Sequence, residues 1–349
     1  MRGLLWLVGA GAMIGAGGLL MTQGDAGTAA HKQRDNLTFP TSQRPIDRER
    51  EATRTTLAPA EPAEPKEHAA PAHDPLLVAL PPEAVTALVF EAGTILKAPV
   101  GQAMLACVGK EERARMDKGV AEMGKTWVDL AERVGVASLP EKGGMFVVQG
   151  KLDGFDIQKL EPHAESRTYG ADTTIYDDVR EDAWEFHAAV WHGSLLLGSH
   201  LPGVVEAAIN RLDSGGAGTT LAFDENDAYG EIYGKVGQAD LERMAPEEMK
   251  SRLHDVAAHA EVHVDAITEV LMVMDVEGSD AKQVEDLGKS LGAAMAVGRL
   301  EARREGRDDV VRLVDQSRVR PYGDRRLRAE VAVPLDIMTK SMHGCGGEE

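Results

Sequence analysis

The segment Glu185–Leu212, EFHAAVWHGSLLLGSHLPGVVEAAINRL, decides the fold because it predicts three consecutive elements. Residues 186–191 alternate between two faces, as expected of a half-buried strand. His192-Gly193 supplies turn residues, and residues 195–197 begin a second apolar run. This part of the segment therefore predicts two antiparallel strands joined by a tight turn.

The second part of the segment predicts a helix. Pro202 suits a first helical turn because its φ is fixed and the N–H that it lacks has no partner there. Four apolar residues then follow at helical spacing, namely Val205, Ala208, Ile209 and Leu212. Gly215-Gly216 is placed to end the helix. The whole segment indicates a hairpin whose following helix packs back onto its own sheet.

A similar order of elements occurs twice in the chain. A strand followed by a helix-capping Asp occurs at Phe146/Asp156 and again 124 residues later at Val270/Asp280. A strand followed by Pro and a helix occurs at Leu195/Pro202 and again 132 residues later at Leu327/Pro334. This echo predicts an α+β fold of two similar modules. Each module is expected to be a mainly antiparallel sheet with helices packed on one face. The modules are assigned to residues 76–220 and 221–343, with a flexible tail at 344–349.

Three further regions have a periodic pattern. Residues 116–134 carry apolar side chains at steps of three and four, which predicts a helix that Gly135 would stop. Residues 224–236 fail the calcium-loop pattern and predict a helix capped by Asp224. His259–Val276 predicts one long strand or two short ones. Asp280 then caps a helix whose buried stripe is Val284, Leu287, Leu291 and Met295.

Residues 1–24 predict a secretory signal peptide or a signal-anchor helix. No charged residue lies between Gly3 and Gly24, Arg2 precedes this apolar stretch, and Thr28-Ala29-Ala30 offers small residues for cleavage. A spanning helix needs about 20 apolar residues and a signal core about 7–15, so both possibilities stay open. Residues 25–75 are rich in Pro and Ala and predict a disordered linker. We therefore expect the globular part on the periplasmic or extracellular side of the cell envelope.

The globular part is acidic. The formal charge of the chain is -19, and residues 76–349 hold 30 Lys and Arg against 48 Asp and Glu. A surface of this sign repels nucleic-acid phosphates and anionic lipids. We therefore expect no nucleic-acid partner, and we expect membrane contact only through the N-terminal segment.

The pattern His259-x-Glu261-x-His263-x-Asp265 is the main candidate for a metal site. Alternate residues of a strand share a face about 6.6–6.8 Å apart, so both imidazoles can approach one zinc ion, with Glu261 or Asp265 as ligand or base. An exposed polar strand face has the same pattern, and the sequence favours that interpretation. His187, His192 and His200 cluster around the hairpin and could supply a further zinc ligand.

The remaining reactive residues favour structural roles. Ser194 and Ser199 lack the glycine-rich turn of a hydrolase nucleophile, and Tyr176-Asp177-Asp178 indicates a turn more than a carboxylate pair. Cys107 and Cys345 are the only cysteines, and two free thiols are favoured over one disulfide. Residues 299–328 hold ten Arg against six acids, which favours an ion-paired surface over a face for an anionic partner.

These features favour a membrane-tethered or secreted extracytoplasmic module without enzymatic activity. It would bind a partner, with an envelope protein as the expected class, or form part of an envelope assembly. The alternative is a metal-dependent hydrolase with zinc at His259, Glu261 and His263. A third possibility is ligand storage in a groove between the two modules. The sequence identifies neither the ligand nor the oligomeric state.

Overall fold

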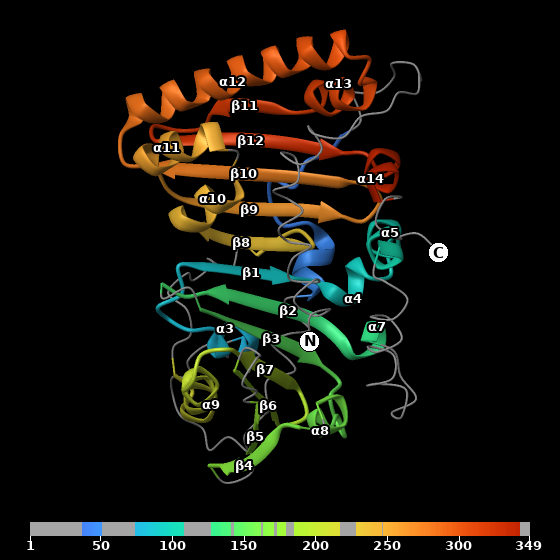
Figure 1. Cartoon of the computed structure of the whole chain (residues 1–349), viewed down its shortest axis with the longest axis vertical. Helices are drawn as coiled ribbons and strands as arrows, with labels where there is room; N and C mark the ends of the chain where they lie inside the picture. Colours follow the sequence, from blue (N-terminus) through green and yellow to red (C-terminus); the bar gives the residue numbers. More distant parts are fainter. Residues whose placement is uncertain are drawn as a thin grey trace. The chain divides into compact units, whose positions relative to one another are not determined.

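The structure is a computed structural model of the whole chain. It describes residues 37–50, 74–107, 127–140, 143–161, 163–170, 173–178, 185–216, 228–245 and 247–342. The chain divides into two compact units, of which unit 1 comprises Met1–Thr41, Thr94–Ala114 and Gly230–Glu349, and unit 2 comprises Ser42–Gly93 and Arg115–Tyr229. Each unit packs helices against antiparallel strands, which confirms the expected mixed helix-and-strand class (Figure 1).

Unit 2 is built on strands that pair antiparallel in the order β1-β2-β3-β7-β6-β5-β4. Their bounds are β1 Thr86–Phe90, β2 Ala131–Ser138, β3 Gly144–Gly150, β4 Glu165–Tyr169, β5 Thr173–Asp178, β6 Phe186–Trp191 and β7 Leu195–Ser199. The helices of this unit are α3 Pro75–Ala79, α7 Trp127–Leu130, α8 Ile157–Leu160 and α9 Val204–Ser214, and α4 Ala92–Ile95 lies at the sequence boundary with unit 1.

The predicted hairpin and helix in unit 2 are confirmed. β6 pairs with β7, and the turn between them has positive φ at His192 (46°) and Gly193 (62°). α9 ends where Gly215 adopts the left-handed conformation, as the sequence predicts. Its buried side chains, Val205, Ala208 and Ile209, face the sheet because α9 contacts β6 and β7.

Unit 1 is built on strands that pair antiparallel in the order β8-β9-β10-β12-β11. Their bounds are β8 Ile232–Gly237, β9 Ala257–Ala266, β10 Val270–Gly278, β11 Arg318–Pro321 and β12 Arg326–Val333. The helices are α5 Pro99–Cys107, α10 Gln238–Met244, α11 Glu247–Val256, α12 Ala281–Arg304, α13 Asp308–Asp315 and α14 Leu335–Met342.

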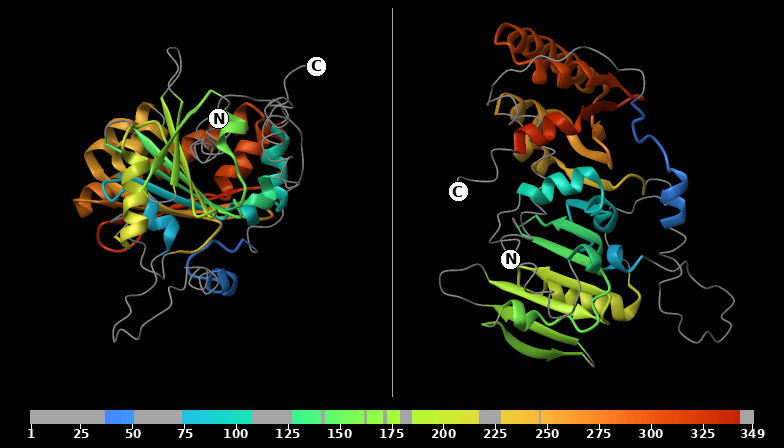
Figure 2. Two further views of the ribbon diagram at one scale, coloured as in Figure 1. Left: turned by 90° about the horizontal axis from the view of Figure 1, so that it is seen from below. Right: turned by 90° about the vertical axis from the view of Figure 1, so that its right-hand side faces the viewer.

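The longest helix of unit 1, α12, begins at the predicted cap. The Asp280 carboxylate accepts a hydrogen bond from the backbone N–H of Gln283 at 2.9 Å. Val284 and Leu287 are buried, as predicted for the core-facing stripe. α12 contacts β10, β11 and β12 and lies along the β11 side of the sheet, away from β8 (Figures 1 and 2).

The helix predicted over 116–134 is wrong at its C-terminal end. Residues 108–126 lie outside the described residues, but 131–138 form β2, which pairs with β1 on one side and β3 on the other. Gly135 is therefore in mid-strand, where an added Cβ would lie 2.7 Å from a side-chain carbon of Leu76. Strand pairing on both sides outweighs the helical spacing of the apolar residues.

The helix predicted over 224–236 is also wrong in its described part. Residues 217–227 lie outside the described residues, and Ile232–Gly237 forms β8, which pairs with β9. For His259–Val276, the sequence predicts one long strand or two short ones. The segment contains two strands, β9 and β10, because residues 267–269 form a bend between them.

The predicted signal or anchor at 1–24 lies outside the described residues, as does the tail at 344–349. No described helix is both long enough and apolar enough to cross a membrane. Within the linker predicted over 25–75, residues 45–50 are helical. Asp47 stabilises this turn, because its carboxylate accepts hydrogen bonds from the backbone N–H of Arg44 at 2.8 Å and from its guanidinium at 2.9 and 3.0 Å. The module boundary at residues 220 and 221 stays a prediction.

Candidate binding site

One face of the unit 1 sheet carries charged side chains across three neighbouring strands. Strand register places Glu261 of β9 opposite Asp275 of β10, and Asp275 opposite Arg328 of β12. A second row joins His259, Glu277 and Arg326 in the same way. Because alternate residues of a strand point to the same side, both rows lie on one face. The opposite face carries the apolar residues of β12, such as Leu327.

The centre of this face is a buried ion pair. Arg328 donates from Nε to Asp275 Oδ1 at 2.7 Å and from Nη2 to Oδ2 at 2.6 Å. The two side chains are 8% and 9% exposed. The Arg328 guanidinium carbon also lies 3.6 Å from the centre of the Tyr322 ring, a cation–π contact. The pair therefore ties β10 to β12 and fixes Tyr322 at the end of the β11–β12 hairpin.

The predicted metal residues all lie on the charged face of β9. His263 is 2% exposed, and its Nε2 lies 3.5 Å from Glu261 Oε1. A hydrogen bond from His263 lowers the pKa of Glu261, burial opposes this effect, and the charges of His263, Lys235 and Arg326 add to the lowering. His259 instead approaches Glu277, with 4.0 Å between Nε2 and Oε2. Glu261 therefore lies beside His263, whereas His259 lies beside the carboxylate of Glu277.

A metal centre needs at least three converging ligands, and no group of three or more His, Cys, Asp and Glu side chains with that geometry is found in the part of the chain that the structure describes. The zinc site at His259, Glu261 and His263 stays a prediction. The histidines considered as further ligands belong to unit 2. There His187 Nδ1 lies 2.6 Å from Asp177 Oδ1, and the His192 ring stacks on Trp191 with 4.1 Å between ring centres.

The serines of the hairpin have structural partners. Ser199 Oγ donates to the Gly144 carbonyl and accepts from the Leu201 backbone N–H, each at 3.0 Å. Ser194 Oγ donates to the Trp191 carbonyl at 3.3 Å. Asp177 lies in β5, where the predicted turn is absent, and its second oxygen accepts from Arg167 Nε at 2.6 Å. Cys107 lies on α5, and Cys345 lies outside the described residues.

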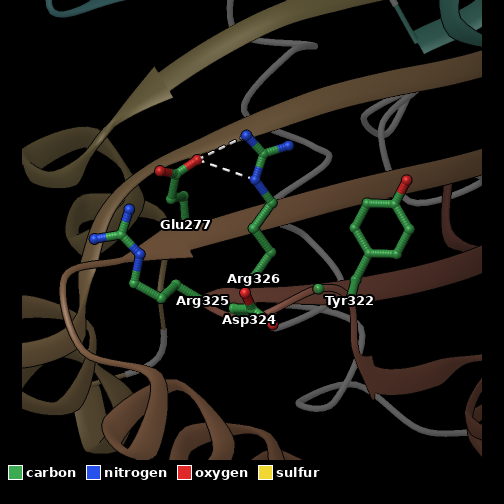
Figure 3. A pocket seen from close by; sticks show the side chains of 6 residues that line it. Glu277, Tyr322, Asp324, Arg325 and Arg326 are labelled. Atoms are coloured by element: carbon green, nitrogen blue, oxygen red, sulfur yellow. Dashed lines mark hydrogen bonds and ion pairs between the residues drawn. The ribbon is translucent and has the colours of Figure 1, made fainter.

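A cleft of about 460 Å³ opens at the edge of the charged face. It is lined by Glu277 of β10, by Tyr322, Gly323, Asp324 and Arg325 of the β11–β12 turn, and by Arg326 of β12. Arg326 donates from Nε to Glu277 Oε2 at 3.0 Å, and its Nη2 lies 3.0 Å from the same oxygen. In Figure 3, Arg325 and Tyr322 lie on opposite sides of Arg326.

The turn that forms the cleft is held at both ends by backbone hydrogen bonds. The Tyr322 N–H donates to the Arg326 carbonyl at 2.8 Å, and the Gly278 N–H donates to the Arg325 carbonyl at 3.0 Å. Gly323 has φ of 72°, which few other residues adopt. Arg325 is exposed and makes no ion pair with a described residue. The cleft therefore offers a ligand an exposed hydrogen-bond donor that projects from a fixed backbone.

Chemically, the cleft offers hydrogen-bond donors and acceptors that could bind a polar ligand. Its lining contributes two guanidinium groups, two carboxylates and one phenol, so its formal charge is balanced. Its lining contains no Ser, Cys or His. Sequence reasoning missed this site, although the alternation of Arg326, Arg328 and Glu330 was a visible signal. The expected ion pairing of the Arg-rich region agrees with the observed pairs.

No protein-family model matches this chain, and no curated protein sequence matches it. Two solved structures of the protein TP0453 are similar to it. Crystal form I has a TM-score of 0.47 and 10% sequence identity, covering 78% of this chain and 98% of that chain. Crystal form IV has a TM-score of 0.47 and 11% identity, covering 76% and 95%. No residue role is transferred at this level of identity.

Proposed function

We propose that this protein is a non-enzymatic binding module that works on the extracytoplasmic side of the cell envelope. The observation that carries the proposal is the cleft at the β11–β12 turn, which combines a fixed backbone with an exposed guanidinium on Arg325. The uncharged stretch from Gly3 to Gly24 and the Pro- and Ala-rich residues that follow support export and tethering or secretion.

The chemistry of the cleft favours a polar segment of an envelope protein as the ligand. Its balanced charges give no preference for a phosphate or another strong anion, whereas its donors and acceptors match those of peptide backbone and polar side chains. Tyr322, which is 40% exposed, adds an amphipathic contact surface of the type enriched in protein interfaces. Arg325 and Tyr322 are therefore the residues expected to contribute most to binding.

The proposal is tested by affinity capture with matched charge reversals. The full chain is used to capture partners from a membrane fraction, alongside Arg325→Glu and Lys97→Glu. Lys97 is exposed and lies outside the cleft. Each variant replaces a positive side chain with a negative one, so both change the net charge equally. We expect a partner that wild type and Lys97→Glu retain and that Arg325→Glu loses. Equal capture by all three proteins would refute the role of the cleft.

We also propose that the two units are copies of one duplicated module. Strand order supports this idea, because β8-β9-β10-β12-β11 corresponds to β1-β2-β3-β7-β6 in both position and connection. The sequence echo aligns the same strands, since Phe146 in β3 corresponds to Val270 in β10 and Leu195 in β7 corresponds to Leu327 in β12. α9 and α14 then follow equivalent strands.

Unit 2 differs by its additional strands β4 and β5. Separate expression of each copy as a folded protein would test this proposal, and failure of both to fold would contradict it.

A further inference from the structure

The outer side of α12 exposes apolar side chains. The sequence from Leu291 to Gly298, LGAAMAVG, contains no polar side chain. The inner side of the helix carries the buried residues Val284, Leu287 and Ala302, which face the rest of unit 1. On the outer side, Val297 and Leu300 are 54% and 55% exposed. These two exposed residues make the outer side of α12 a candidate interaction surface.

The exposed residues form a continuous line along the helix, which we call the α12 stripe. Its members are separated by steps of three, four or seven residues and therefore share one side of the helix. They are Asp286, Ala293, Val297, Leu300 and Arg304, all of them exposed. An acidic residue thus ends the stripe near the helix N-terminus, and a basic residue ends it near the C-terminus.

The charges of α12 are complementary to those of a second α12 that runs in the opposite direction. Asp286 and Arg304 lie nine residues on either side of Met295, and Lys289 and Glu301 lie six residues on either side. Antiparallel pairing centred on Met295 would therefore place Asp286 opposite Arg304 and Lys289 opposite Glu301. Glu285, which would lie opposite Glu305 in this register, is paired with Lys289 of its own helix at 2.7 Å. A parallel pair would instead place Asp286 opposite Asp286 and Arg304 opposite Arg304.

The same register pairs two of the three apolar residues of the stripe. Ala293 and Val297 lie two residues on either side of Met295, so each would contact the other across the symmetry axis. We propose that this protein forms a homodimer through antiparallel pairing of α12 with α12 of a second copy. This inference is independent of the proposed function, because the α12 stripe includes none of the residues that line the cleft.

The helix dimensions set the expected strength of the dimer. α12 has 24 residues and is therefore about 36 Å long. A contact strip about 10 Å wide along this length would bury about 360 Å² per partner, which is less than the roughly 800 Å² of a standard interface. We therefore expect a weak dimer whose population rises with protein concentration.

The test is sedimentation equilibrium of the full chain in a density-matched neutral detergent, from about 1 µM to about 200 µM. Asp286→Arg and Arg304→Asp should each raise the dimer dissociation constant at least about tenfold, because each creates two like-charge contacts. The double variant Asp286→Arg/Arg304→Asp should restore the wild-type value to within about threefold. Arg303→Asp is the matched control, because it makes the same chemical change one residue earlier, off the stripe.

The outcomes separate this dimer from other associations. Recovery in the double variant, with no change in Arg303→Asp, supports the antiparallel register. A monomer at every concentration overturns the proposal, as does a dimer that none of the charge changes affects, since that would assign association to another segment. If Val297→Glu leaves the molecular mass unchanged but lowers binding to phosphatidylcholine vesicles, the α12 stripe is a lipid-binding surface and the proposal is also overturned. Unchanged far-UV circular dichroism shows that each variant is folded.

Discussion

Replacing Arg328 with Met is expected to destabilise unit 1 strongly. The substitution retains much of the side-chain volume but removes both hydrogen bonds to Asp275, whose carboxylate is 9% exposed. Removing one partner of a buried ion pair costs about 3–5 kcal/mol because the other charge stays buried without compensation. The cation–π contact with Tyr322 is lost as well, at a cost of about 0.5–2 kcal/mol. We therefore expect the free energy of unfolding to fall by at least about 3 kcal/mol.

Two matched variants isolate the cause. Arg326→Met makes the same change beside Glu277, but these side chains are 47% and 27% exposed, so we expect a loss of no more than about 1 kcal/mol. The double variant Asp275→Leu/Arg328→Met removes both buried charges, and its stability should return to within about 1 kcal/mol of wild type or exceed it. The comparison therefore separates an unpaired buried charge from lost packing.

The measurement is urea unfolding followed by circular dichroism, with hydrogen exchange of β10 and β12 amides to locate the effect in unit 1. Equal losses of stability in Arg328→Met and Arg326→Met would contradict the role of the buried charge. A double variant as unstable as Arg328→Met alone would also contradict it, because packing would then account for the whole loss.

Burial raises the pKa of Asp177, but hydrogen bonds from Arg167 and His187 outweigh it and hold the pKa below its ordinary value. At pH values above the pKa of the unfolded side chain, this carboxylate therefore stabilises the fold, and the effect is lost as pH falls through the lower pKa of the folded state. In acid-unfolding curves, the stability difference between wild type and Asp177→Asn should therefore shrink below about pH 4. Gly198→Ala would place a Cβ 2.2 Å from the phenylalanine ring opposite it on β3, and thermal unfolding should show a loss of about 1–3 kcal/mol; unchanged stability would contradict this packing. The binding proposal expects less than one equivalent of zinc in the purified chain by elemental analysis, whereas stoichiometric zinc that is lost in His263→Ala would favour the metal-dependent hydrolase.

Local signals explain the parts of the fold that the sequence predicted. His192-Gly193 encodes the β6–β7 turn through residues close in sequence, and Gly215 ends α9 through its own backbone conformation. Asp156 and Asp280 likewise act within three residues, since each carboxylate accepts a backbone N–H of the helix that follows. Such features depend on few distant contacts, and pattern reasoning therefore identifies them.

Long-range pairing explains the parts that the sequence did not reveal. The apolar spacing before Val134 matches a helix, yet β2 forms because β1 and β3 offer hydrogen-bonding partners on both sides. The cleft depends on Arg326 meeting Glu277, which lies 49 residues earlier in the chain. Each of these residues alone looks like ordinary surface charge, and only the strand register shows that they form one site.

The central claim is that an exported module binds an envelope protein through the cleft of unit 1. Its most direct test places a photo-cross-linking amino acid at Tyr322 in intact cells and identifies the cross-linked protein. The account predicts an envelope protein, with cross-linking reduced by the additional change Arg325→Glu. Absence of a cross-link, or cross-links to cytosolic proteins alone, would contradict the claim.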